Sequence, residues 1–566
     1  MADENAVELL KQGDKRFAKR QQLDSLRQEI ALNFAPQLAL WTGPLNLGDD
    51  FCSHLVDGTP LLLARDYVGQ IGSMLRPAGK QWFWHRTPHE ELNNTTSLRK
   101  YLDWRSSQMM RIMFDRESGT EGALKEADEF YGLFGDAVIS VDLNERMNAI
   151  RVQNHHTKDC TWSIGKANKA DVLTRKEMIE ARVIKARFSQ SGDKLHEKII
   201  EACEKEGDKE FEIRHEVRPA AEYDAYVKKG AMKRKDGYVS VWIDATHRTV
   251  IRETHWPTFR YVIPRAGRRH GFAYGFSRAT MAALPDARLI QQQAVAIMEA
   301  AEKQISPPLV AYTDAIRGDI RLDGITWIDG KYDERSGDPL RALELGKNFQ
   351  LGVESILRTE AQLTRAFYLD RLRMPDTRSS KSTMEVSFMI DEFVRSAVPL
   401  FSPMKVEYSD EFLYEVDTII ESMGGYNTME KPKDLRDTEL TFAWDNPLTD
   451  MIERQKAQKA SELSMLAQSW AGLEAAAAQS PSLQQVNTEK GFRESAMAIG
   501  VASWLRDPKE AKKLVEQSAA DNQMREMVAA APNIAEVVHR GAQAAQIASE
   551  IPNPAEPGLP LLPAPA

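Results

Sequence analysis

Two long helical segments in the middle of the chain, separated by a short glycine-containing module, restrict the possible folds more than any other feature. The first, 284–305, is about 33 Å long at 1.5 Å per residue, with Pro285 expected in its first turn. Pro307 and Pro308 end it. The second, 347–373, is about 40 Å long. Such helices predict a hairpin-like column with a small head; on topology alone, an ordinary coiled-coil protrusion fits as well.

The first 265 residues carry both helical and strand patterns. In several stretches apolar residues recur at spacings typical of amphipathic helices. Short runs rich in β-branched and aromatic residues indicate strands. The expected helices are 3–35, 59–75 and 95–132 (interrupted at 118–120), and the expected strands are 81–84, 137–141, 238–243 and 249–251. This part is therefore predicted to be an α+β unit.

The part of the chain that follows the column is predicted to be mostly helical. Residues 376–382 contain no apolar side chain, which indicates an exposed loop. Helix then resumes and ends at Met423, before two glycines. A strand is expected at 438–444, and alanine-rich helices at 448–547. Six prolines in residues 551–566 predict an unfolded, partly polyproline II tail.

Composition excludes several classes of protein. Of the 566 residues, 42% are hydrophobic and 28% charged, which is typical of globular proteins. A net charge of −9 argues against a chain that grips nucleic acid over its whole surface, although an acidic protein can still surround DNA. Cys52, Cys160 and Cys203 are too scattered for a disulfide framework, which indicates a reducing compartment. A polar N-terminus and the lack of an apolar stretch of ~20 residues argue against a signal peptide and a membrane span.

The sequence lacks familiar catalytic and nucleotide-binding motifs. It contains no G-x-x-x-x-G-K-[ST], H-E-x-x-H, G-x-S-x-G or C-x-x-C. His155 and His156 could ligate a metal with Asp159 or Cys160, but adjacent side chains rarely point the same way and no second pair lies at ligand spacing. We therefore interpret the two histidines as structural or surface residues, and expect no catalytic residue, no cofactor and no metal.

One basic cluster precedes a glycine turn. It consists of Arg265, Arg268, Arg269 and His270. A phosphate contact is one interpretation. A single cluster on an acidic chain favours the other, a solvated turn.

A series of short motifs runs through the chain in order. They are Leu75-Arg76-Pro77 with Trp82-Phe83, the segment 132–138, Tyr274-Gly275-Phe276-Ser277-Arg278, Leu284-Pro285-Asp286, Ser306-Pro307-Pro308-Leu309, Ser382-Thr383-Met384-Glu385-Val386 and Asn446-Pro447-Leu448. Together they resemble the portal proteins, or head-to-tail connectors, of tailed bacteriophages, most closely the short-tailed, T7-like type. The resemblance spans roughly residues 5–530, with Arg278 standing where the family has a proline.

The resemblance implies the portal fold, an α+β and mostly helical architecture of wing, stem, clip and crown. The implied parts are an N-terminal wing at 1–283, a first stem helix at 284–305, a clip at 306–346, a second stem helix at 347–373, a tunnel loop at 374–383, a wing return at 384–450, a helical crown at 451–550 and a disordered proline-rich tail at 551–566.

It also implies a function without catalysis. About twelve copies would form a ring at one capsid vertex, around a channel for DNA packaging and ejection. The implied partners are double-stranded DNA, the terminase large subunit, the tail adaptor and internal core proteins, and the major capsid and scaffold proteins, with no membrane. The ring would assemble in the host cytoplasm and reside in the virion.

Particular residues take roles under this resemblance. The first stem helix would start with Tyr274, Gly275, Leu284, Pro285 and Asp286. The clip would start at Pro307 and Pro308. The tunnel loop would supply a sparse positive ring that centres or clamps DNA transiently, from Arg373, Arg378 and Lys381.

Ring assembly would give the column partners on both flanks. Apolar stem residues are therefore expected to be partly exposed in a single chain, namely Ile290, Ala294, Ile297, Phe349, Leu357 and Leu363.

Two other functions stay open. One is a different non-enzymatic phage head or tail component, such as a scaffold-like or tail adaptor protein. The other is a cytosolic enzyme with a helical lid that uses His155, His156 or the 265–270 cluster.

Overall fold

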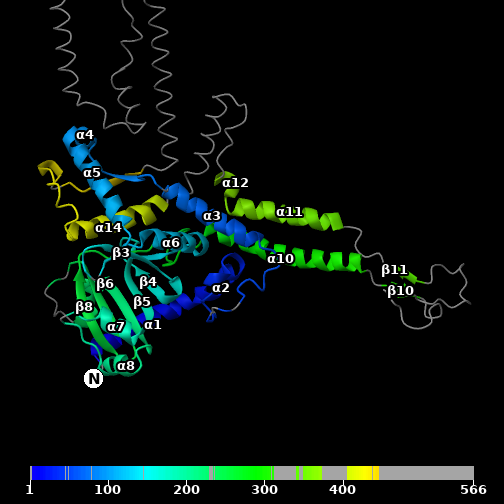
Figure 1. Cartoon of the computed structure of the whole chain (residues 1–566), viewed down its shortest axis with the longest axis horizontal. Helices are drawn as coiled ribbons and strands as arrows, with labels where there is room; N and C mark the ends of the chain where they lie inside the picture. Colours follow the sequence, from blue (N-terminus) through cyan, green and yellow to red (C-terminus); the bar gives the residue numbers. More distant parts are fainter. Residues whose placement is uncertain are drawn as a thin grey trace, which may run out of the picture. The chain divides into compact units, whose positions relative to one another are not determined.

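The computed structural model shows helices packed with antiparallel sheets (Figure 1). The structure describes residues 3–306, apart from 45, 47, 49, 78, 145, 191, 229–233 and 235, and then residues 309–311, 340–342, 349–372, 404–435 and 438–444. The chain divides into two compact units, one comprising Met1–Asn93 and Leu98–Lys459 and the other Asn94–Ser97 and Ala460–Ala566. Nearly all described residues belong to the first unit.

The helices expected near the N-terminus are confirmed. The region 3–35 forms α1 (Glu4–Arg20), the short turn η1 (Gln21–Leu23) and α2 (Asp24–Phe34). Then come η2 (Pro36–Leu38), α3 (Thr59–Leu75), α4 (Glu90–Asn94), α5 (Thr96–Met113) and α6 (Thr120–Phe134). Gly119 and Gly135, at the two ends of α6, have φ angles of 68° and 90°, a left-handed conformation that glycine adopts without strain.

A five-stranded antiparallel sheet forms the largest β element, in the order β4-β5-β6-β7-β8. Its strands are β4 (Cys160–Ile164), β5 (Ala170–Glu180), β6 (Glu210–Pro219), β7 (Tyr238–Asp244) and β8 (Thr249–Trp256). The last two contain the strands expected at 238–243 and 249–251. Register is fixed by pairs such as Val217 with Ser240 and Val241 with Glu253.

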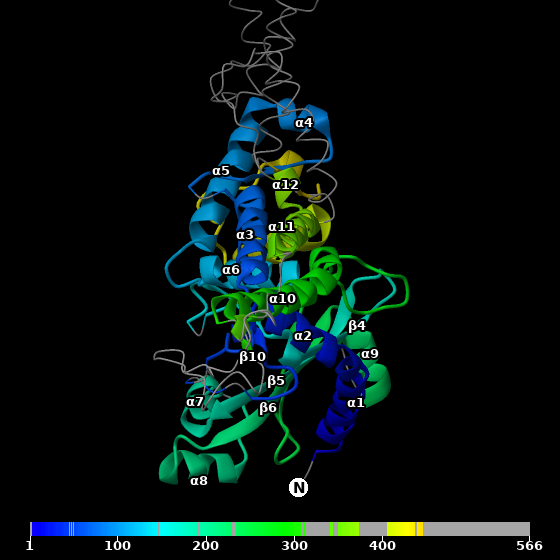
Figure 2. The same ribbon diagram turned by 90° about the vertical axis from the view of Figure 1, so that its right-hand side faces the viewer.

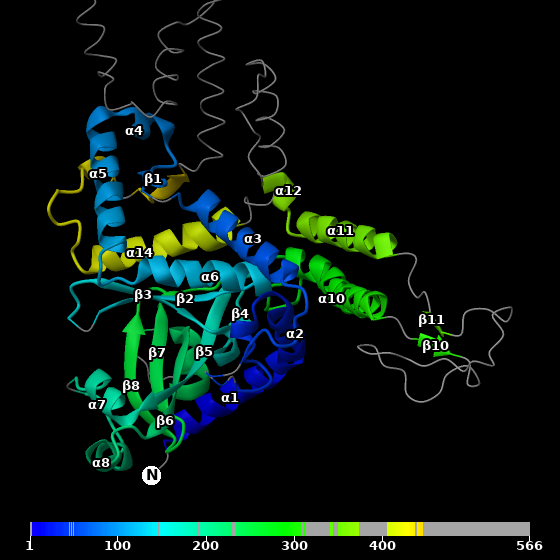
Figure 3. The same ribbon diagram turned by 45° about the vertical axis from the view of Figure 1, so that its right-hand side comes forward.

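The two faces of this sheet are covered by different helices (Figures 2 and 3). Alternate residues of a strand point to opposite faces. On β6, Arg214 lies on the face covered by α1, where it pairs with Asp14. The neighbouring Ile213 lies on the other face, in a cluster with Ile184 of α7 (Ala181–Arg187) and Ile199 of α8 (Glu197–Lys205).

Two smaller sheets connect distant parts of the chain. β2 (Val138–Leu143) pairs with β3 (Ile150–His155) and β9 (Tyr261–Val262). β1 (Phe83–Arg86) pairs with β12 (Thr441–Trp444), so residues near 440 return to the N-terminal part. The remaining short elements before the hairpin are η3 (Thr157–Asp159), α9 (Ala220–Tyr223) and the π-turn η4 (Asp224–Lys228).

The expected column is a helical hairpin, with two differences from the sequence prediction. Helix α10 is Arg278–Ile305, so it begins before 284 and Pro285 does not lie in its first turn. The hydroxyl of Ser277 caps the earlier start. The return helix α11 is Phe349–Ala366; Tyr368, with a φ of 56°, separates it from α12 (Leu369–Leu372). The expected continuous helix over 347–373 is therefore wrong at this point.

Between these helices, the described part of the head is a pair of short antiparallel strands, β10 (Leu309–Ala311) and β11 (Leu340–Ala342). The rest of the clip at 306–346 lies outside the described residues, as do the tunnel loop at 374–383, the crown at 451–550 and the tail at 551–566. Among the described helices, none is both long and apolar enough to cross a bilayer.

After the hairpin, the described chain contains η6 (Lys405–Ser409), α14 (Asp410–Ser422), η7 (Lys433–Leu435) and β12. It is anchored to the N-terminal helices by polar contacts. The buried Tyr408 hydroxyl donates to Asp128 of α6 at 2.9 Å, and Asp417 of α14 pairs with Arg105 of α5 at 2.8 Å. Gly424, with a φ of 77°, follows the end of α14, as the sequence predicts.

Candidate functional site: a helical hairpin locked at its base

The start of α10 is bonded directly to the end of α6. The Ser277 hydroxyl donates to the Gly132 carbonyl at 2.6 Å and accepts from the Thr280 backbone N–H at 3.4 Å. The Thr280 hydroxyl in turn donates to the Leu133 carbonyl at 2.7 Å. All three hydrogen bonds are buried, so the first turn of the hairpin is fixed to the last turn of α6.

Two glycines allow the backbones to approach each other at this joint. A Cβ atom placed on Gly275 would lie 2.2 Å from the Gly135 carbonyl oxygen, and one on Gly135 would lie 2.4 Å from the backbone of Phe276. The same Gly135 carbonyl accepts a 2.7 Å hydrogen bond from the Ala266 N–H. The space between the two segments therefore admits no side chain at either position.

A buried ion pair stands beside the two glycines. The Arg27 guanidinium donates to both carboxylate oxygens of Asp136, at 2.7 and 2.9 Å, and both side chains are almost fully buried. The Gly275 N–H also donates to Asp136, at 3.3 Å. Burial raises the pKa of Asp136, while Arg27 and the Gly275 N–H act in the opposite direction. The pair ties α2, the α6–β2 link and the start of α10 together.

Tyr274 attaches the joint to the large sheet. Its hydroxyl lies 2.9 Å from the Thr161 hydroxyl, and its ring packs on Trp162, with ring centroids 4.5 Å apart. The indole N–H of Trp162 donates to the Ala273 carbonyl at 2.8 Å. Of the residues predicted for the start of the first stem helix, Tyr274 and Gly275 thus belong to this joint.

The other three residues of that prediction lie further along α10. Leu284 is buried in the main hydrophobic cluster, Asp286 is half-buried, and Pro285 is exposed. Pro285 removes the hydrogen bond that an amide at this position would donate to the Met281 carbonyl. The structure therefore divides the predicted set between the joint and the second and third turns of the helix.

Sequence reasoning missed Arg27 and Asp136, which carry the central contact of the joint. One signal was present, because Asp136 is the only charged residue between Leu133 and Val141, in a run that is otherwise apolar or small. Nothing in the sequence places Arg27, 109 positions earlier, beside it.

Above the joint, the two helices of the hairpin pack on each other. Gln293 of α10 donates to the Ser355 hydroxyl of α11 at 2.8 Å and accepts from Thr359 at 3.0 Å. A Cβ atom on Gly352 would lie 3.1 Å from Ile297, so the helices approach closely here. Toward the base, Gln291 accepts hydrogen bonds from two backbone amides of the loop before α3, at 2.8 and 2.9 Å.

The outer surface of the hairpin carries exposed apolar side chains. They are Met281, Leu289, Val295, Met298 and Ile305 on α10 and Leu351, Val353 and Leu357 on α11. At 100° per residue, Leu289 and Ile305 lie about 160° apart around the axis of α10. Apolar surface therefore faces solvent on two different flanks.

The sequence prediction of exposed stem residues is confirmed for Leu357, which is 57% exposed. It is wrong for Ile290 and Leu363, which are fully buried against the main hydrophobic cluster. It is also confirmed for Ala294 and Ile297, which are half-buried and so partly exposed. The side chain of Phe349 lies outside the described residues.

The histidine pair has a structural role. The His155 ring lies 2.8 Å from the Ser140 hydroxyl and contacts Arg175, while the His156 ring accepts from the Lys158 N–H at 3.0 Å. Burial lowers the pKa of both imidazoles, that of His156 to about 4. In the part of the chain that the structure describes, no three His, Cys, Asp or Glu side chains gather in a way that could hold a metal ion.

The basic cluster at 265–270 is a solvated turn at Arg268, Arg269 and His270, which are exposed as predicted, but not at Arg265. Arg265 is buried and donates to the Asn168 carbonyl. Arg268 forms an ion pair with Glu407 at 2.5 Å, and Arg269 lies over the ring of Phe276. Arg265 and Arg268 thus bond the segment before α10 to neighbouring parts of the chain.

The remaining predicted site residues lie outside the described residues. They are Pro307, Pro308, Arg373, Arg378 and Lys381. Their assignment to the clip and the tunnel loop stays a prediction.

The structure thus holds a long helical hairpin by buried contacts at its base and leaves apolar side chains exposed on its flanks. The family model for the bacteriophage head to tail connecting protein matches residues 8–505, and the chain belongs to this family. A solved structure described as "Neck of empty GTA particle computed with C6 symmetry" aligns over 79% of this chain and 90% of its own, with 10% identity and a TM-score of 0.34. No curated protein matches the sequence.

Proposed function

We propose that this chain is a portal subunit, about twelve copies of which form a ring at one capsid vertex around a DNA channel. Two findings support the proposal. The chain belongs to the connector family. Its helical hairpin is held at the base by buried hydrogen bonds and exposes apolar side chains on two flanks. A single chain exposes these side chains to water. In a cyclic ring, each hairpin has one neighbour on either side, and both flanks become covered.

Under this proposal α10 and α11 line the ring as its stem. Residues 1–283 form the wing and 384–450 return to it. The clip at 306–346 docks the terminase large subunit during packaging and the tail adaptor afterwards. The crown at 451–550 faces the capsid interior and the core proteins. The ring assembles in the host cytoplasm with the scaffold and major capsid proteins and remains in the virion.

The charge of the hairpin suits a channel through which DNA moves. Residues 278–305 carry three basic and three acidic side chains, and residues 349–372 also carry three of each. Each phosphate that a protein neutralises adds salt-dependent affinity, which would slow a moving duplex. A nearly neutral channel wall attracts the phosphates only weakly. A ring that only docks a packaging motor also needs no nucleotide-binding motif of its own.

Native mass measurement with negative-stain electron microscopy tests the ring. Twelve chains of 63.9 kDa predict a particle of about 770 kDa with a central hole. A protein that remains a monomer or dimer at every concentration and ionic strength would contradict the proposal.

A second experiment tests the tunnel loop. Replacing Arg378 and Lys381 with alanine should reduce the retention of packaged DNA, because about twelve copies of each cation would be lost from the ring. The matched control replaces two exposed cations of helix α7, Arg182 and Lys185, with alanine. Unchanged genome length and retention in the loop variant would contradict the assigned role of these residues.

A further inference from the structure

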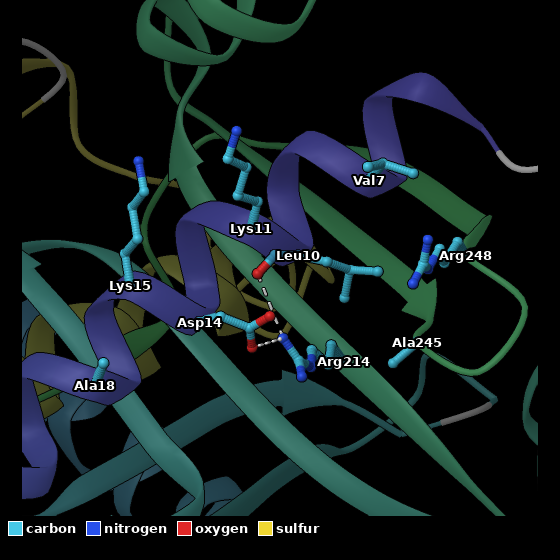
Figure 4. A pocket seen from close by; sticks show the side chains of 9 residues that line it. All are labelled: Val7, Leu10, Lys11, Asp14, Lys15, Ala18, Arg214, Ala245 and Arg248. Carbon is cyan, nitrogen blue, oxygen red and sulfur yellow. Dashed lines mark hydrogen bonds and ion pairs between the residues drawn. The ribbon is translucent and has the colours of Figure 1, made fainter.

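The α1 face of the large sheet carries a pocket with an apolar lining and a basic rim (Figure 4). The apolar lining consists of Val7, Leu10, Ala18 and Ala245, and the ion pair of Asp14 with Arg214 lies between Leu10 and Ala18. The rim consists of Lys11 and Lys15, which rise side by side from α1, and Arg248 at the other end. A surface of this kind fits a partner with an apolar side chain surrounded by carboxylates.

The rim cations are available to such a partner. The fourth cation of the pocket, Arg214, is occupied by Asp14 and Glu212, each at 2.7 Å. Lys11, Lys15 and Arg248, in contrast, form no ion pair with any carboxylate of the described residues.

The backbone fixes the place of Arg248. This residue lies in the turn between β7 and β8 with a φ of 58°, and its carbonyl accepts a 3.0 Å hydrogen bond from the Asp3 N–H. The Asp244 carboxylate accepts hydrogen bonds from the amides of Thr246 and His247 in the same turn. The pocket rim is therefore held by two elements, the turn and α1.

Helix α8, on the other face of the same sheet, has the complementary surface. Ile199 faces the core, whereas Ile200 is 37% exposed. Glu197, Glu201 and Glu204 are exposed and, being three, four and seven positions apart, form one acidic strip. Ile200 lies beside this strip, three positions after Glu197 and four before Glu204. Of these, Glu201 pairs with Lys205 at 3.6 Å, both being well exposed.

The two surfaces cannot meet within one chain, because the sheet lies between them: α1 packs on Val239, Val241 and Ile243, while α8 packs with Ile213 and Trp242. Surfaces that are complementary and face in opposite directions generate a head-to-tail contact between copies, which gives a ring when the rotation between neighbours closes.

We propose that α8 of one subunit docks into the α1 pocket of the next, with Ile200 on the apolar lining and Glu197, Glu201 and Glu204 facing the basic rim. This proposal depends on the ring proposed above. It adds contacts between the sheets of neighbouring subunits to those between their hairpins. Charge complementarity identifies a second copy of this chain as the occupant, since the chain itself supplies the matching helix.

Reversing the charges on each side separately tests the contact. One variant carries Lys11→Glu and Lys15→Glu, the other Glu201→Lys and Glu204→Lys. The changed positions are exposed, and both residue types are good helix formers. Each variant places like charges across the contact, and the protein concentration needed for ring formation should rise on the order of tenfold to a hundredfold. The matched control carries Lys100→Glu and Lys125→Glu, on α5 and α6.

Mixing the two variants gives the decisive result. One has two acidic surfaces and the other two basic ones, so an equal mixture should form rings in which the subunits alternate. A chain with all four substitutions should again form rings alone. Mass photometry measures both outcomes, and circular dichroism verifies that each variant is folded.

The outcomes separate this proposal from the ring itself. If the unchanged chain forms no ring, the proposed function fails. If it forms rings and either single-sided variant assembles like the control, the α1–α8 contact is overturned. Impaired assembly without rescue on mixing also overturns it.

Discussion

The base and the outer part of the hairpin differ in the contacts that their side chains make within a single chain. At the base, Ser277, Gly275 and Asp136 find their partners within the chain, and those contacts are buried. Further out, Leu289 and Leu357 are exposed by 42% and 57%. The same pair of helices thus has buried contacts within the chain at its base, whereas apolar side chains further out are exposed to solvent.

This difference separates two kinds of mutation. A change at the base removes contacts that the single chain already has, so it should lower the free energy of unfolding. A change on the outer surface removes nothing from the single chain and should act on assembly alone. The expected loss in the free energy of unfolding is therefore largest at the base and smallest on the outer surface.

The largest effect is expected for Asp136→Asn. The substitution leaves the buried Arg27 guanidinium without a counter-charge, and breaking a buried pair in this way costs about 3–5 kcal/mol. Urea denaturation of dilute protein measures the loss. Replacing both partners, as Arg27→Met with Asp136→Leu, should recover much of it, since no unpaired charge remains. A loss below about 1 kcal/mol for Asp136→Asn would show that the joint does not depend on this pair.

A smaller loss, of about 2–3 kcal/mol, is expected for Gly275→Ala. The added methyl group would lie 2.2 Å from the Gly135 carbonyl oxygen and 2.8 Å from that of Ala266, so the backbone must move. The control is Gly122→Ala in α6, where a Cβ atom meets nothing within 4 Å. That change should leave stability equal or raise it, because alanine is the better helix former. Equal denaturation midpoints for the two variants would contradict the close approach.

A contact at the sheet predicts a pH-dependent effect of about 1 kcal/mol. Asp193 accepts two hydrogen bonds from Arg252, at 2.6 and 2.7 Å, and these lower the pKa of Asp193 below its usual value. A carboxylate with a lowered pKa stabilises the fold above the unfolded pKa of about 4, and this contribution is lost as the pH falls toward the folded value. Asp193→Asn should therefore be less stable at pH 7.

The stability of the Asp193→Asn variant should converge with that of the unchanged chain as the pH is lowered from 5 to 3. Convergence is expected because a protonated aspartic acid and an asparagine both lack the charge that Arg252 pairs with. Urea midpoints across this range provide the measurement. A difference that stays constant with pH would show that the charge of Asp193 contributes nothing.

Local patterns were enough to predict most elements, because helices and strands follow from spacing within a segment. The helix at 59–75 and the strands near 238–243 and 249–251 lie where the sequence places them. The hairpin was also predictable, since prolines and glycines mark its limits. The start of α10 was not, because the hydrogen bonds that join Ser277 and Thr280 to α6 connect segments far apart in the sequence.

The contacts of the joint could not be predicted, since they join residues far apart in the sequence. Arg27 lies on α2 and Asp136 follows α6, so their contact depends on how these helices pack. The same holds for Arg265, whose burial depends on the fold and not on its basic neighbours. Ile290 and Leu363 were expected at an interface and are instead core residues, because an apolar pattern does not distinguish a core from an interface.

The smallest effect on stability is expected at the outer surface of the hairpin. Leu289→Glu and Leu357→Glu should each change the free energy of unfolding of the dilute chain by less than about 0.5 kcal/mol, because the side chains already face water. In a ring, however, a buried unpaired carboxylate at either position is costly, and assembly should need on the order of tenfold more protein. The control is Leu62→Glu on α3, because Leu62 is 58% exposed and Leu357 is 57% exposed.

Sedimentation velocity across a concentration series compares the three variants. If Leu62→Glu assembles normally and the two hairpin variants do not, exposure alone does not explain the defect, and the hairpin flanks are the surfaces that meet. If all three assemble like the unchanged chain, the apolar side chains of the outer hairpin have no partner in the ring. The contrast between the base and the outer part would then reflect only how far the hairpin extends beyond the core that holds it.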